Sequence, residues 1–195
     1  MKNHTRLFCL LLLIFCLGLS ACSVERLDQD PCSLPDPTVP EGCQPPADPD
    51  AQQIDPSVEQ TCYLTISCAT ILDNMEDLTP GKEPLVPEDG MLLDRVAVTF
   101  HPGESAFDLL QRETRNRKLH LEYNTTPLYQ SAYIKGICNL YEFDCGPNSG
   151  WIFRVNGWQP NYGVSRYLLQ PGDEIELLYT CDLGRDLGAD WTDGL

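Results

Sequence analysis

Hydrophobic and polar residues alternate with a period of two in four stretches of the chain, residues 63–68, 94–100, 151–155 and 174–179. Successive side chains of a strand point to opposite faces, so this period predicts strands that bury one face and expose the other. The side chains expected on the buried faces are Leu64, Ile66, Cys68, Val96, Val98, Phe100, Trp151, Phe153, Val155, Ile175, Leu177 and Tyr179.

A spacing typical of a helix follows the second of these stretches. Phe107, Leu110 and Thr114 are three and four residues apart and would lie on one helical face. Ser105 precedes them and has an acidic residue three positions later, which is the pattern of a helix N-cap. We expect the helix to run to about Lys118, followed by short strands near residues 119–123, 133–137 and 140–143.

Two turn signals complete the predicted architecture. Asn156-Gly157 directly follows residues 151–155 and indicates a two-residue hairpin, because that turn needs positive φ at both central positions. A second turn is expected at residues 171–173, before the last strand. The order of two strands, one helix and several further strands predicts an α+β domain, with a mixed sheet and one helix packed across it.

The N-terminus has the pattern of an export signal. Lys2 and Arg6 precede an apolar run, residues 7–19, which is too short to span a membrane. Leu19-Ser20-Ala21-Cys22 resembles the bacterial lipoprotein signal. That resemblance implies removal of residues 1–21, a diacylglycerol thioether on Cys22, and attachment to the extracellular face of the cell membrane. The alternative is a plain secretory peptide with an incidental cysteine.

Residues 22–60 are predicted to form an extended, disordered tether, and residues 61–195 the folded domain. Half of the 16 prolines fall within residues 23–60, where nine acidic residues accompany one basic residue, Arg26. Few large apolar side chains are present, so this stretch cannot bury enough surface to offset its chain entropy.

The charge of the chain excludes several functions. The formal net charge is −16, and loss of residues 1–21 would make it −18. Binding to nucleic acid depends on clustered Lys and Arg, so we expect no nucleic-acid partner. His101 and His120 have no partner visible by spacing, and the cysteine spacings do not fit zinc pairs. The sequence therefore predicts a protein that is not an enzyme, without catalytic residues, a metal or a required cofactor.

The C-terminal third resembles a known family. Residues 151–157, 163–167 and 172–175 are similar to the transcobalamin C-terminal family, and residues 62–184 resemble its bacterial branch, a domain of unknown function. The further matching stretches are residues 66–72, 85–90, 142–146 and 179–184. The resemblance implies a β-grasp-like fold, no established catalytic residues, and cobalamin as a bound ligand.

Seven cysteines would remain beyond Cys22 in the mature chain: Cys32, Cys43, Cys62, Cys68, Cys138, Cys145 and Cys181. In the fold that the resemblance implies, the first and last strands are parallel neighbours, which would allow a Cys68–Cys181 disulfide. Family members often carry a cysteine at the position of Val164, and its absence here suggests a relocated disulfide, Cys138–Cys145. The connectivity of Cys32, Cys43 and Cys62 stays open, including a link from Cys62 to the tether.

Aromatic residues around the predicted hairpin are the leading candidates for ligand binding. Trp158 follows the Asn-Gly turn, and Asn161 and Tyr162 lie in an expected exposed loop. A loop-borne Trp and Tyr with flanking amides suits the edge of a flat ligand or a protein partner. Trp151 and Tyr167 are further candidates, although we expect both to belong to the core.

These observations predict a non-enzymatic surface lipoprotein whose domain contributes to cobalamin or corrinoid binding or uptake. The alternative is a cell-surface module that binds a protein, such as a transporter partner, or a wall polymer, with no corrinoid role. Both hypotheses place the protein on the membrane through its lipid.

Overall fold

The computed structural model describes residues 44–48, 51–126 and 131–189. The predicted signal peptide, Cys22, Cys32 and Cys43 lie outside these residues. No helix within them is both long and apolar enough to cross a bilayer. The strands and the helix follow the order β1 (Gln60–Ser67), β2 (Met91–Phe100), α2 (Ala106–Arg117), β3 (Leu121–Thr126), β4 (Ser131–Ile137), β5 (Leu140–Tyr141), β6 (Gly150–Val155) and β7 (Glu174–Thr180). The short 3₁₀ helices are η2 (Ala69–Asp73), η3 (Met75–Asp77), η4 (Glu83–Leu85), η5 (Val164–Arg166) and η6 (Arg185–Leu187).

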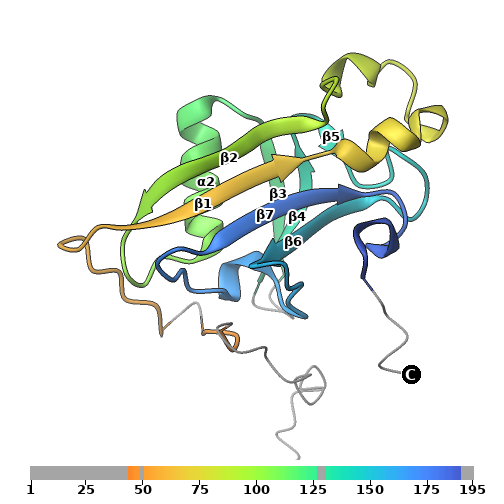
Figure 1. Ribbon diagram of the computed structural model, residues 1–195. Helices are drawn as coiled ribbons and strands as arrows, with labels where there is room; N and C mark the ends of the chain where they lie inside the picture. The colour runs from red at the N-terminus through yellow and green to blue at the C-terminus, as the bar shows by residue number, and fades with distance from the viewer. Residues whose placement is uncertain (1–43, 49–50, 127–130, 190–195) are drawn as a thin grey trace, which may run out of the picture. The chain divides into compact units, whose positions relative to one another are not determined.

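Four strands form a mixed sheet in the order β2-β1-β7-β6, with the parallel pair β1 and β7 at its centre (Figure 1). Leu64 lies opposite Ile175 in this pair and opposite Val96 in the antiparallel pair of β1 and β2. Leu64, Ile66 and Leu177 are fully buried, so the face predicted from the alternation is confirmed as the buried face.

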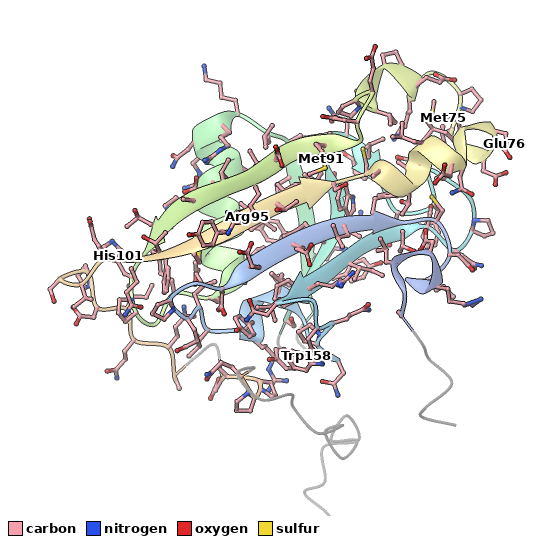
Figure 2. The ribbon with its side chains drawn as sticks, in the orientation of Figure 1. Met75, Glu76, Met91, Arg95, His101 and Trp158 are labelled. Carbon is pink, nitrogen blue, oxygen red and sulfur yellow. The ribbon has the colours of Figure 1, made fainter. Side chains whose placement is uncertain are left out.

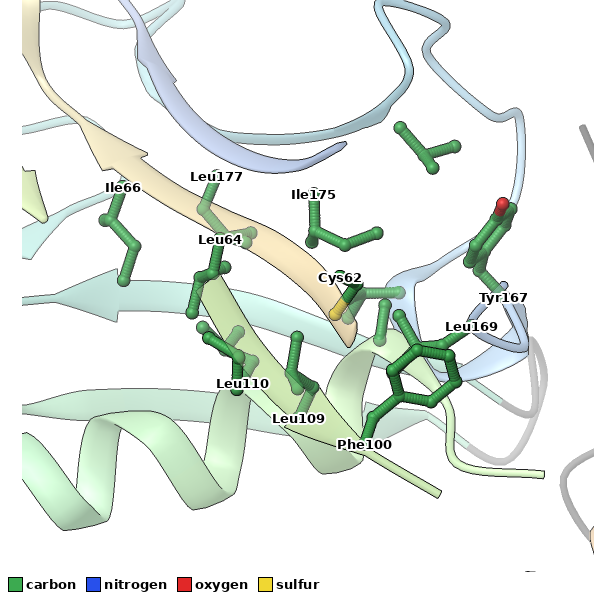
Figure 3. Close-up of a cluster of buried hydrophobic side chains, with 14 of the residues drawn as sticks. Cys62, Leu64, Ile66, Phe100, Leu109, Leu110, Tyr167, Leu169, Ile175 and Leu177 are labelled. Atoms are coloured by element: carbon green, nitrogen blue, oxygen red, sulfur yellow. The ribbon is translucent and has the colours of Figure 1, made fainter. Parts of the chain in front are cut away.

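The core lies between this face and helix α2. Leu109 and Leu110 of the helix pack into the same cluster as Leu64, Phe100 and Ile175 (Figure 3). Burying each such side chain contributes about 1.5–3 kcal/mol. The observed architecture is therefore α+β, as predicted.

The ends of α2 confirm the predicted cap. The Ser105 hydroxyl accepts the Asp108 N–H, the Asp108 carboxylate accepts the Ser105 N–H, and Lys118 ends the helix at φ 58°. The buried face differs slightly from the expected one. Leu109 lies in the core, whereas Phe107 is only partly buried and packs edge-on against Tyr123 of β3, with 4.7 Å between ring centroids.

The other three strands form a separate antiparallel sheet, β3-β4-β5, where the sequence predicted a single mixed sheet. Ala132, Ile134 and Ile137 of β4 belong to the same core cluster as the residues of α2, so the small sheet covers the same side of the large one. Strand β5 is shorter than the strand predicted at residues 140–143. Phe143 adopts φ 68° and therefore does not continue the extended conformation.

Candidate functional site

The candidate loop, residues 156–163, begins at the hairpin that Asn156-Gly157 predicts. Asn156 and Gly157 have φ values of 51° and 78°, and Val155 and Trp158 exchange two backbone hydrogen bonds of 2.8 Å. This is the geometry of a two-residue turn with positive φ at both central positions. The prediction at Asn156-Gly157 is thus confirmed, and the turn fixes Trp158 at the end of β6.

Trp158 and Tyr162 form an aromatic pair on this loop. Their ring centroids are 6.0 Å apart with an interplanar angle of 72°, an edge-to-face arrangement. Both side chains are partly exposed, and Asn161 between them is exposed. The structure therefore brings together the three leading candidates on one surface loop, at the end of the sheet marked by Trp158 in Figure 2.

Close backbone approach holds the loop against β4. A Cβ atom at Gly163 would lie 1.8 Å from the Ser131 hydroxyl oxygen, so only glycine fits there. The Ser165 hydroxyl accepts the Ala132 N–H at 2.9 Å. These contacts join the loop to the small sheet and give the aromatic pair a defined support.

The other two candidate aromatic residues lie elsewhere. Tyr167 is fully buried, and its hydroxyl donates to the Asp173 carboxylate at 2.9 Å. Trp151 donates from its indole nitrogen to the Leu140 carbonyl and packs edge-on against Tyr179 at 5.3 Å. Tyr167 is thus part of the interior, and Trp151 is partly buried against the core, with a backbone partner for its indole nitrogen.

Part of the segment predicted to be a tether contacts the candidate loop. We call residues 44–48 and 51–59 the N-terminal strap. The Ala47 N–H donates to the Arg166 carbonyl at 2.8 Å, and the Arg166 side chain donates back to the Ala47 carbonyl at 3.2 Å. The Tyr162 hydroxyl donates to the Gln44 carbonyl. Sequence reasoning missed this contact, because a proline-rich, acidic stretch carries no periodic pattern.

The strap also contacts the turn before α2. The Gln52 amide donates to the Asp108 carboxylate at 2.7 Å, and the Asp55 N–H donates to the Pro102 carbonyl at 2.9 Å. The strap therefore lies along the domain from the candidate loop to the start of the helix.

A polar network around His120 was also missed. The Tyr141 hydroxyl donates to Glu122 at 3.0 Å and lies 3.1 Å from His120 Nε2, while Lys135 pairs with Glu122 at 3.1 Å. A hydrogen bond from Lys135 and a weaker one from Tyr141 lower the pKa of Glu122. The four side chains come from β3, β4, β5 and the residue before β3, so the network ties the small sheet together.

No group of His, Cys, Asp or Glu with metal-binding geometry occurs in the described part of the chain. His101, at the end of β2, lies 2.8 Å from the Val58 carbonyl through Nδ1 and thereby contacts the strap. The histidines at positions 101 and 120 thus both have structural partners.

The two predicted disulfides are not formed. Cys68, Cys138, Cys145 and Cys181 are free thiols, as is Cys62. The register of the parallel pair explains the first difference: Ser67 lies opposite Leu178, so Cys181 is two positions further along than the residue that faces Cys68. Cys138 lies in the β4–β5 turn at φ 51°, whereas the Cys145 thiol is directed to the Asn74 carbonyl at 3.3 Å.

A family model described as "Domain of unknown function (DUF4430)" matches residues 103–180. This is the transcobalamin-like C-terminal family that the sequence resembles, although the match begins later than the residues 62–184 of the predicted resemblance. No curated protein matches the chain.

Two of the solved structures that are similar to the chain illustrate the match. One is haptocorrin in complex with Cbi, with 10% identity, a TM-score of 0.46, and coverage of 67% of this chain and 27% of haptocorrin. The other is a protein from Ruminococcus gnavus ATCC 29149 whose description suggests metal binding, with 13% identity, a TM-score of 0.39, and coverage of 62% and 96%. The chain thus spans about a quarter of haptocorrin's length, and neither similarity carries a functional assignment.

Proposed function

We propose that this chain is a non-enzymatic, lipid-anchored surface protein that contributes to corrinoid binding through the loop after β6. The anchor would be Cys22, and the protein would face the outside of a bacterial membrane. The observation that carries the proposal is the edge-to-face pair of Trp158 and Tyr162 on a surface loop. The corrinoid is chosen because residues 151–157, 163–167 and 172–175 resemble the transcobalamin C-terminal family.

The chemistry of the loop fits a large, flat ligand with a polar rim. Aromatic rings supply rigid contact area with little loss of side-chain entropy. Gln159 and Asn161 lie between the two aromatic residues in the chain, and their side-chain amides can donate hydrogen bonds to peripheral groups of a ligand and accept them from such groups. Because the loop touches a ligand from one side only, we expect weak binding unless a partner protein covers the other side.

Equilibrium dialysis of the full chain against hydroxocobalamin, read from the corrin spectrum, tests this function. We expect binding that weakens at least about tenfold, roughly 1.4 kcal/mol, in Trp158→Ala and Tyr162→Ala. Trp151→Phe is the matched control, because Trp151 packs inside the domain, and it should bind as the parent does. Absence of binding at about millimolar ligand, roughly −4 kcal/mol, would contradict the proposal.

Binding of a surface protein is a second candidate, favoured by a different observation. Phe143 and Leu183 are 63% and 50% exposed and have φ values of 68° and 51°, so two large apolar side chains sit on left-handed backbone. Their loops are joined by the hydrogen bond from the Leu183 N–H to the Asn148 carbonyl at 3.0 Å. Unusual backbone conformations that present apolar side chains to solvent often mark contact sites.

Pull-down from surface extracts separates the two candidates. A protein captured by the parent chain and by Trp158→Ala, but lost with Phe143→Ser, would support this second function. Capture profiles that are identical for all three proteins would exclude Phe143 from any such contact.

A further inference from the structure

Cys145 and Cys181 lie on two neighbouring chain segments at one end of the large sheet. Gly150, at the start of β6, is the register partner of Thr180, at the end of β7. Beyond this pair the two segments stay together, because Asn148 accepts the Leu183 N–H at 3.0 Å and its side chain donates to the Asp182 carboxylate at 3.3 Å. The segments that carry the two thiols are therefore held side by side.

Both sulfur atoms face the same short piece of chain. The Cys145 thiol lies 3.3 Å from the Asn74 carbonyl, and the Cys181 thiol lies 3.8 Å from the Thr70 hydroxyl. The Asn74 side chain in turn donates to the Thr70 carbonyl at 2.7 Å. Cys145 belongs to the buried cluster that includes Tyr179, and Cys181 packs against that cluster.

The two thiols also interact with each other. Burial, and to a smaller extent a side-chain hydrogen bond with Cys181, raise the pKa of Cys145 to about 12. Burial raises the pKa of Cys181 as well, whereas the bond to Cys145 lowers it. Among the five described cysteines, Cys145 and Cys181 are thus joined by a hydrogen bond between their thiols.

We infer that Cys145 and Cys181 are the pair that oxidises to a disulfide, and that the bond forms when the protein is exported. The inference relies on the proposed surface location for its oxidising environment. The oxidant is the disulfide of a thiol–disulfide oxidoreductase or of glutathione. The Cys181 thiolate attacks that disulfide and releases one thiol. The Cys145 thiolate then attacks the mixed disulfide and releases the second thiol, so two electrons and two protons pass to the oxidant.

The bond would close a ring of 37 residues that contains β6, the whole candidate loop and β7. It would also join the segments that carry Phe143 and Leu183, so the backbone beneath both exposed side chains would be less free to move. In the chain-entropy model a ring of this size raises the midpoint of thermal unfolding by about 10 °C for a domain of about 150 residues.

Peptide mapping of the unreduced protein tests the pairing directly. Cleavage on the N-terminal side of aspartate separates the relevant cysteines. Cys145 lies in the fragment of residues 144–172, and Cys181 lies in the fragment of residues 173–181. Cys138 lies in a third fragment, residues 108–143. We expect fragment 144–172 linked to fragment 173–181. A link from Cys68 to Cys181, or from Cys138 to Cys145, would overturn the inference.

Two preparations of the full chain keep the pairing separate from the proposed location. One is exported with its own leader and extracted with detergent under iodoacetamide. The other is produced reduced, purified and equilibrated with oxidised and reduced glutathione. A bridge in the second preparation alone supports the pairing and contradicts the proposed location. Free thiols at both positions in the second preparation would overturn the pairing.

Thermal unfolding gives a readout that does not depend on mapping. Oxidation should raise the midpoint by about 10 °C in the parent and in Cys138→Ser, and should leave it unchanged in Cys181→Ser. An equal rise in Cys181→Ser would overturn the inference. If Cys181→Ser does not fold, the mapping of the parent chain decides the question.

Discussion

At the scale of single residues, the candidate aromatic side chains fall into two groups, according to whether their polar atoms bind groups inside the domain or on its surface. The Tyr167 hydroxyl and the Trp151 indole donate to groups inside the domain. The Tyr162 hydroxyl instead donates to the strap, which lies on the surface of the domain. The sequence predicted that Trp151 and Tyr167 belong to the core, but the partners of their polar atoms could not be predicted from it, because those partners lie on other segments of the chain.

Tyr167→Phe should lower the free energy of unfolding by about 1–2 kcal/mol, because the buried Asp173 carboxylate loses a hydrogen bond. Urea unfolding measures the change. Tyr133→Phe is the matched control: that side chain is 51% exposed and donates to Glu142, so its loss should change stability by less than about 0.5 kcal/mol. If both variants lost the same free energy of unfolding, burial of the acceptor carboxylate would not determine how much stability the lost hydrogen bond contributes.

A second prediction concerns the Cys62 thiol in the reduced protein. Cys62 is fully buried, and burial raises its pKa from 9.0 to about 12. Between these values the unfolded chain loses the thiol proton while the folded chain keeps it, so the unfolded state binds fewer protons. Stability should therefore fall as the pH rises above 9, by up to about 1.4 kcal/mol per pH unit from this group.

Urea unfolding of the parent and of Cys62→Ala between pH 8 and 11 would measure this slope. The variant is expected to be less stable at pH 8, because the core loses a buried side chain, and to lose stability more gradually above pH 9. Parallel curves for the two proteins would contradict the assignment to Cys62.

At the scale of elements, the strands and the helix were predictable and the strap was not. Alternating apolar residues marked β1 and β7, and the Ser105 cap and the Asn156-Gly157 turn depend on neighbours a few residues apart. The contact of Ala47 with Arg166 joins positions far apart in the chain, and on the Ala47 side it uses backbone atoms, which leave no trace in residue type. For the same reason the proximity of the segments that carry Cys145 and Cys181 could not be predicted, since loops rather than strands decide where these two residues lie.

Gly103→Ala should release the strap from the turn before α2. Gly103 has φ 91°, and a Cβ atom there would lie 2.0 Å from the Gln53 carbonyl oxygen. Gly81→Ala is a matched control, because Gly81 has φ 90° and no atom within 4 Å of the added Cβ. Both variants carry the backbone strain of about 1 kcal/mol, but only the first meets a steric clash.

Amide hydrogen exchange at Asp55, whose N–H donates to the Pro102 carbonyl, reports the release. We expect exchange to accelerate on the order of tenfold, about 1.4 kcal/mol, in Gly103→Ala and to stay unchanged in Gly81→Ala. Acceleration in both variants would assign the effect to backbone strain instead of the clash.

At the scale of the whole molecule, the sheet is organised around strands from the two ends of the domain. β1 is bonded on both sides, to β2 and to β7, and β7 is bonded to β1 and β6. The parallel pair joins segments that are about 110 residues apart in the chain, so the entropy of closing this long loop slows folding. The small sheet is built instead from neighbouring strands, β3 to β5.

The amides in β1 and β7 should therefore exchange most slowly with solvent, at rates set by global unfolding. Those in β3 and β4 should exchange faster, through opening of the small sheet alone. Residue-resolved hydrogen exchange would measure both sets, with Leu64 and Leu177 as reporters of the fully buried centre. Equal protection of the amides in β3 and β1 from exchange would contradict the prediction that the small sheet opens on its own.

The strap also determines how the domain would respond to mechanical force. A pull on the N-terminal side reaches the Gln44–Tyr162 contact first, then the Ala47–Arg166 contact, and then the contacts of Gln52 and Asp55. These bonds are broken one after another, as in peeling, and each gives way at low load. The bonds of β1 with β2 and β7 come later and resist together, as in shear. Under such a pull the strap would thus detach from Tyr162 and uncover the candidate loop while the sheet stays folded.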